Sequence, residues 1–104
     1  MSAQELPHPL PNELAQFLSA RLSLLGDETR IRILDQLRHG ERNVQAIADE
    51  LLTTQQNVSG HLRLLRAAGV VARRPAGREA YSAALNETVF EVWGRLVEGE
   101  RRRM

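Results

Sequence analysis

The sequence predicts a mainly helical protein with one small β-hairpin, in the order helix, helix, helix, helix, strand, strand, helix. Apolar residues recur at helical spacing along most of the chain, and glycines interrupt this pattern. After Gly69 the period falls toward two at Val70 and Val71, ahead of a Pro/Gly turn. A chain of 104 residues with 42% apolar content has room for one domain, which would bury roughly two-thirds of its unfolded surface.

Composition divides the chain into three predicted segments. Residues 1–11 hold three prolines, whose fixed backbone angles exclude a regular helix, so we expect a flexible Pro-rich N-terminal arm. Residues 12–98 form the predicted domain. Residues 99–104 are a basic C-terminal tail.

Three helices are expected in the first half of the domain. The first runs from Asn12 to Gly26, because leucine and phenylalanine recur there at helical spacing. Asp27 is a good N-cap for the second helix, which ends near Gly40. A third, shorter helix follows the cap Asn43.

The third and fourth helices are predicted to form a helix-turn-helix unit. Thr54 is the expected cap of the fourth helix, which ends at Gly69. Only Leu52, Thr53 and Thr54 separate the two helices, which is the connection length of such a unit. Its second helix usually enters the major groove of DNA.

The two end helices carry apolar stripes that one small core would not absorb. Leu85, Asn86 and Phe90 fit a hydrophobic staple around an asparagine cap, which opens the last helix. We therefore expect the first and last helices to meet in a homodimer. The residues assigned to this interface are Leu14, Phe17, Leu18, Val89, Val92, Trp93 and Leu96.

Charge is unevenly distributed, although the formal net charge is only +1. Residues 51–78 contain five arginines and no acidic residue, which suits a polyanionic partner. The start of the fourth helix carries amide and hydroxyl groups that can read base edges or hold phosphates; a solvated polar face is the alternative. The residues assigned to double-stranded DNA are Thr54, Gln55, Gln56, Asn57, Ser59, His61, Arg63, Arg74, Gly77 and Arg78.

Several runs of sequence resemble the arsenical-resistance repressor (ArsR/SmtB) family. LGDETRIRIL at 25–34 is similar to its opening signature, and VSGHLRLLRAAGVV at 58–71 to its recognition-helix segment. RRPAGR at 73–78, followed by Tyr81, resembles its wing. The resemblance covers about residues 14–97. It implies a winged helix-turn-helix homodimer joined by its end helices, acting as a repressor at an inverted-repeat DNA operator.

Two departures from the family pattern bear on structure and on sensing. Leu52 stands where the family usually has glycine, so a left-handed backbone there would cost of order 1 kcal/mol. The segment 44–51 lacks the cysteine pair of arsenic- and lead-responsive members. The last helix lacks the Asp and His ligands of zinc-responsive members.

We expect no metal site within one chain and no cofactor. Cysteine is absent, which excludes a thiolate site, and the three histidines form no i, i+4 pair. The remaining alternative is a nickel or zinc ion bound at a subunit boundary through His8, His39 or acids of the last helix, such as Glu87, Glu91 and Glu98. A separate sensor protein could also deliver the signal.

We expect no enzyme either. Ser59 and His61 would point about 200° apart on a helix and could not share a proton. The sequence holds no Gly-rich phosphate loop and no metal motif. It shows neither a signal peptide nor a membrane-length apolar run, so a cytoplasmic protein is expected. A winged-helix module that binds an acidic protein is the alternative function.

Overall fold

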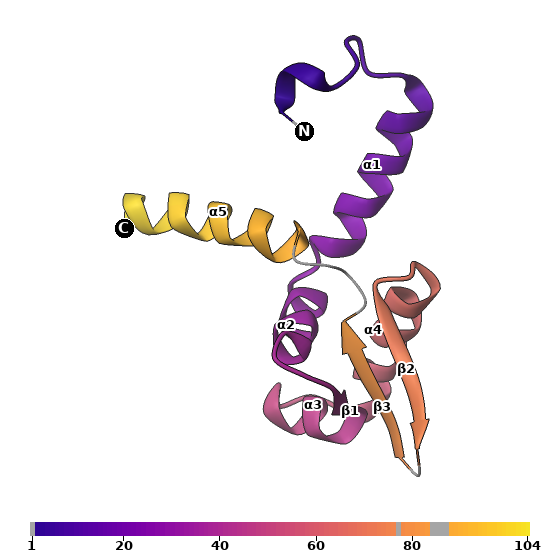
Figure 1. Ribbon diagram of the computed structural model, residues 1–104. Coiled ribbons are helices and arrows are strands. Elements are labelled where there is room, and N and C mark those ends of the chain that lie inside the picture. Colours follow the sequence, from indigo (N-terminus) through magenta and orange to yellow (C-terminus); the bar gives the residue numbers. More distant parts are fainter. Residues whose placement is uncertain (1, 77, 84–87) are drawn as a thin grey trace.

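The computed structural model describes residues 2–76, 78–83 and 88–104, which form a helical body with a three-stranded antiparallel sheet (Figure 1). The elements in chain order are η1 (Ala3–Glu5), α1 (Asn12–Leu25), α2 (Glu28–Leu37), β1 (Arg42–Asn43), α3 (Val44–Glu50), α4 (Gln55–Ala67), β2 (Val71–Ala76), β3 (Arg78–Ala83) and α5 (Thr88–Arg103). The predicted fold class, mainly helical with a β-hairpin, is confirmed.

The structure contains two short elements that the sequence did not predict, the 3-10 helix η1 and the strand β1. β1 pairs with β3 and places Arg42 opposite Tyr81, so the strand order is β1-β3-β2. A strand of two residues is too short to show a period in the sequence. β1 is an edge strand of the sheet, beside β3, and α3 begins directly after it.

Three helices begin at the capping residues that the sequence predicts. In each case the side-chain oxygen accepts a hydrogen bond from the backbone N–H three residues on, which satisfies a donor that the helix leaves unpaired. The bonds join Asp27 to Arg30 at 3.0 Å, Asn43 to Ala46 at 2.8 Å and Thr54 to Asn57 at 3.0 Å. The starts of α2, α3 and α4 are therefore fixed locally by sequence.

α4 ends at the C-cap Ala68, and Gly69 after it turns the chain directly into the sheet. Gly69 has φ 75° and its N–H donates to the carbonyl of Arg66 at 2.9 Å. The N–H of Val70 donates to the carbonyl of Leu65 at 2.8 Å. Val70 and Leu65 are both fully buried, which gives this cap its hydrophobic contact.

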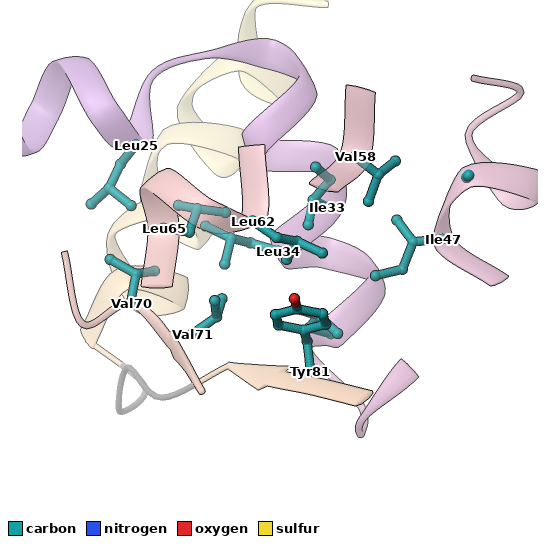
Figure 2. Close-up of a cluster of buried hydrophobic side chains, with 12 residues drawn as sticks. Leu25, Ile33, Leu34, Ile47, Val58, Leu62, Leu65, Val70, Val71 and Tyr81 are labelled. Atoms are coloured by element: carbon teal, nitrogen blue, oxygen red, sulfur yellow. The ribbon is translucent and has the colours of Figure 1, made fainter. Parts of the chain in front are cut away.

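The core lies between α2, α3, α4 and the inner face of the sheet (Figure 2). Its fully buried side chains come from all three helices and from the start of the hairpin, and Tyr81 on β3, 6% exposed, closes it. The largest of these side chains are Ile33, Leu34, Ile47, Leu62, Leu65, Val58 and Val70. This packing fixes α4 on the body and leaves its opposite face outward.

The two end helices project from this body in different directions (Figure 1). α1 begins at Asn12 as predicted and buries only Leu25 among its residues. The described residues of α5 include none that is buried, although Val89 and Trp93 pack against the core. The predicted staple of Leu85 and Asn86 lies outside the described residues. Most of the predicted basic tail belongs to α5, which continues through Arg103.

Candidate nucleic-acid interface

The outer face of α4 is polar, whereas its inner face belongs to the core. Val58, Leu62 and Leu65 have no exposed surface. The predicted DNA contacts of this helix lie elsewhere on its circumference. The exposed ones are Thr54, Gln55, Gln56, Asn57 and Arg63, and the half-buried ones are Ser59 and His61. Amide, hydroxyl and guanidinium groups on one exposed helix face are the groups that contact DNA bases and phosphates.

The turn before α4 has the geometry of a helix-turn-helix unit. It spans residues 51–54, one residue longer than predicted, because α3 ends at Glu50. Leu52 has φ 56°, so it adopts the left-handed conformation whose cost the sequence analysis gave only conditionally, and its side chain is 93% exposed. The N–H of Thr53 donates to the carbonyl of Ala48 at 3.0 Å. The turn is thus closed by backbone bonding despite the unfavourable conformation at Leu52.

Asn57 contributes to the turn as well as to the exposed face. Its backbone N–H donates to Oγ1 of Thr54, and its Nδ2 donates to Oγ1 of Thr53 at 3.1 Å. Both hydroxyls therefore order the N-terminus of α4. The sequence indicated the first of these bonds through the cap pattern, but gave no signal for the second.

The side chain of His61 on α4 bonds to Arg30 of α2. Nη1 of Arg30 lies 3.3 Å from Nδ1 of His61, and Nε of Arg30 donates to the carbonyl of Leu24 at 2.7 Å. A guanidinium has only donors, so Nδ1 of His61 is the acceptor and the ring proton sits on Nε2. His61 therefore positions α4 against the α1–α2 corner, a role that the sequence analysis missed.

The same corner lowers the pKa of Asp27. The largest cause is the hydrogen bond from the backbone N–H of Arg30, burial opposes it, and the charge of Arg30 adds to the lowering. The carboxylate form is thus favoured where it caps α2. The side chain of Arg30 connects this cap to α4.

Arg74, predicted to contact DNA, forms an ion pair within the protein. On β2, its Nε donates to both carboxylate oxygens of Glu41, at 2.9 and 3.2 Å. The pKa of Glu41 is lowered by this hydrogen bond and by the charge of Arg74, and the pKa of Arg74 is raised in turn. Glu41 precedes β1, outside the acid-free stretch, so the sequence gave no sign of the pair.

The hairpin forms a wing beside α4. β2 and β3 pair along their full length, from Val71 opposite Ala83 to Ala76 opposite Arg78. Gly77 and the side chain of Arg78 lie outside the described part of the chain. Their assignment to DNA stays a prediction.

The predicted dimer residues are mostly exposed. Leu14, Phe17 and Leu18 on α1, with Val92 and Leu96 on α5, are between 46% and 67% exposed. A groove of about 600 Å³ runs between α2 and α5 and is lined partly by Trp93 and Leu96. Val89 and Trp93 also pack against the core, so these two have an internal role besides the predicted one.

The histidines do not fit a nickel or zinc site within one chain. His8 lies in the N-terminal arm, His39 follows α2 and His61 bonds to Arg30. Across the residues that the structure describes, no three His, Cys, Asp or Glu side chains gather as metal ligands would. Within the same ranges, no helix has both the length and the apolar content to cross a bilayer.

A helix pair joined by a tight turn, with a polar outer helix and a following antiparallel wing, defines a winged helix-turn-helix domain of the DNA-binding type. A family model described as a helix-turn-helix domain matches residues 25–74. The HTH-type transcriptional repressor SmtB of Mycobacterium tuberculosis is 41% identical over 73 residues, covering 70% of this chain and 54% of that protein. The chain thus spans about half the length of that relative.

Two further proteins match over more of their length. The HTH-type transcriptional regulator Rv2034 of M. tuberculosis is 37% identical over 82 residues, covering 72% of this chain and 77% of that protein. One similar solved structure is the solution structure of the homodimeric winged helix-turn-helix DNA-binding domain of Mb0332 from Mycobacterium bovis, a possible ArsR-family transcriptional regulator. It superposes on this chain with a TM-score of 0.74 at 27% identity. The match covers 94% of this chain and 96% of that one. The chain belongs to the ArsR/SmtB family of transcriptional regulators.

Proposed function

We propose that the protein is a homodimeric cytoplasmic repressor that binds an inverted-repeat operator in double-stranded DNA. The observation that carries this proposal is the outer face of α4, where exposed amide and hydroxyl groups follow a tight turn. α4 would enter the major groove, and the wing would lie on the flanking phosphates or minor groove.

A second copy of the chain is the proposed partner of the end helices. Their exposed apolar side chains form stripes on α1 and α5, beyond the core of one chain. A two-fold dimer would place two copies of α4 about 34 Å apart, one turn of DNA. The Mb0332 domain of M. bovis, which is described as homodimeric, supports a homodimer.

The experiment is selection of bound duplexes from a random library by the purified protein, followed by footprinting at several salt concentrations. We expect an inverted repeat whose half-sites lie one turn apart, with affinity that falls as salt rises. Failure to bind any DNA would instead favour the alternative, a winged-helix module that meets an acidic protein.

We further propose that a single chain is not a strong metal sensor. The scattered histidines and the lack of cysteine support this. A signal would then arrive either at a subunit boundary, where His8 or His39 could meet carboxylates, or through a separate sensor protein.

A further inference from the structure

Gly60 lies at the middle of α4, on the face directed away from the core. At about 100° per residue it stands about 200° around the helix from Val58, which is fully buried. The predicted base-reading residue Gln56 lies one turn before it on the same face. Gly60 is therefore at the centre of the surface that would face the major groove.

Nothing in the described structure explains why this position is glycine. Gly60 is not among the described glycines with positive φ, so an L side chain could adopt its backbone. A Cβ atom added to it would meet no atom within 4 Å outside its chain neighbours and its own helix backbone. Glycine in a helix interior destabilises the helix relative to alanine. Within the described residues, the fold itself therefore gives no reason for the absence of a side chain at position 60.

The missing side chain contributes to a shallow hollow of about 530 Å³ on the outer face of α4. The side chain of Leu64, 52% exposed, lies one turn after Gly60 and gives the hollow an apolar wall. Gln56 gives it a polar end. The hollow is lined by Thr54, Gln56, Asn57, Gly60, His61 and Leu64.

The chemistry of these lining residues favours an apolar group over a phosphate. The lining contains no arginine, and Nδ1 of His61 already accepts from Arg30. Around Gly60 the backbone N–H groups are used in the helix itself, and the first-turn residues Thr54, Gln56 and Asn57 form the polar end of the hollow. In the major groove, the apolar group that a base presents is the 5-methyl group of thymine.

We propose that this Gly60 hollow seats the 5-methyl group of a thymine in each operator half-site. Leu64 packs against the methyl group, and the absent Cβ lets the backbone of α4 approach the base pair closely. Gln56, one turn away, is then placed to reach an adenine edge. The inference rests on the proposed function, because it names the base that the same DNA-binding face reads.

The test replaces each thymine of the selected operator, one at a time, by deoxyuridine, which removes the 5-methyl group alone. For the wild-type protein we expect one position per half-site to lose about fourfold in affinity, the effect of burying one methyl-sized group. Gly60→Ala should weaken binding to the thymine operator at least tenfold and abolish the deoxyuridine effect at that position. Leu64→Ala should reduce that effect while the protein stays folded.

Gly99→Ala is the matched control, because Gly99 on α5 also has open space where a Cβ would lie. Both glycine variants should melt a few degrees higher than wild type, as expected for alanine in a helix. Gly99→Ala should keep wild-type affinity and the deoxyuridine effect. The inference is overturned if Gly60→Ala binds the operator as tightly as the wild-type protein does. It is also overturned if no deoxyuridine replacement weakens binding of the wild-type protein. In either case the proposed function stands. A wild-type protein that binds no DNA overturns both.

Discussion

Arg30 connects three parts of the molecule. Its backbone N–H bonds the Asp27 cap, its Nε bonds the carbonyl of Leu24 at the end of α1, and its Nη1 reaches His61 on α4. The helix α4 is thereby bonded to the corner from which α1 departs, and α1 is the helix that we propose to join the dimer. Because the guanidinium of Arg30 is charged, its hydrogen bonds to the carbonyl of Leu24 and to His61 are stronger than bonds between neutral groups would be. A second bond, from Nη1 of Arg21 on α1 to the carbonyl of Ala68 at 3.0 Å, joins α1 to the end of α4. Arg30 and Arg21 thus add to the core packing that fixes α4 on the body.

Removal of the Asp27 cap should destabilise the protein in a pH-dependent way. At pH 7, Asp27→Ala should lower the free energy of unfolding by about 1 kcal/mol. Because folding lowers the pKa of Asp27 below its ordinary value of 3.8, the charge-dependent stabilisation is complete above that value and is lost as pH falls through the lower folded value. Urea unfolding at a series of pH values measures this.

Asn43→Ala provides the control for this prediction. It removes a cap of the same geometry that carries no titrating group, so its cost should not change in the acid range. A cost of Asp27→Ala that stayed constant down to pH 2 would contradict the role given to the carboxylate.

At the scale of elements, α4 and the wing should contribute differently to DNA binding. Gln56→Ala should cost about 1 to 3 kcal/mol on the preferred operator and relax sequence choice, because an amide reads base edges. Arg78→Ala should weaken binding to all DNA and reduce the salt slope by about one, because a guanidinium neutralises a phosphate. Fluorescence anisotropy on operator and scrambled duplexes separates the two. If both variants lost the same affinity on both duplexes, α4 and the wing would not have the separate roles proposed for them.

Helix boundaries could be predicted from sequence where one residue decides them locally. Caps at Asp27, Asn43 and Thr54, and the glycine at 69, act through bonds to residues a few positions away. The strand β1 could not be predicted, because it is a strand only through its pairing with β3.

The candidate site could be predicted less completely than the fold. Its polar face follows from helical period, but the partner of Arg74 does not. Glu41 lies 33 positions away in sequence, and folding alone brings its carboxylate to the wing. The contact between Arg30 and His61 was hidden for the same reason, with 31 positions between them.

At the scale of the whole molecule, the exposed stripes of α1 and α5 predict a dimer in solution. Val92→Glu or Leu96→Glu should give a monomer or an unfolded protein, because the interface would bury an unpaired charge. Sedimentation at micromolar concentration distinguishes these states. Leu52→Glu changes an equally apolar but 93% exposed residue in the turn before α4, and should stay dimeric. A monomeric wild-type protein would contradict the prediction.

The whole molecule also predicts how the protein responds to metal ions. Tight binding of arsenic, lead or cadmium needs thiolates, and the sequence has no cysteine, so these ions should not release DNA. Zinc or nickel could bind only weakly to one chain, because its described residues form no cluster of ligands. Calorimetric titration of each metal into metal-free dimer, followed by operator binding with and without that metal, measures both effects. His8→Ala and His39→Ala are the matched variants for a site at a subunit boundary. Submicromolar binding that changes operator affinity more than tenfold, about 1.4 kcal/mol of coupling, would show that the dimer is itself a metal sensor.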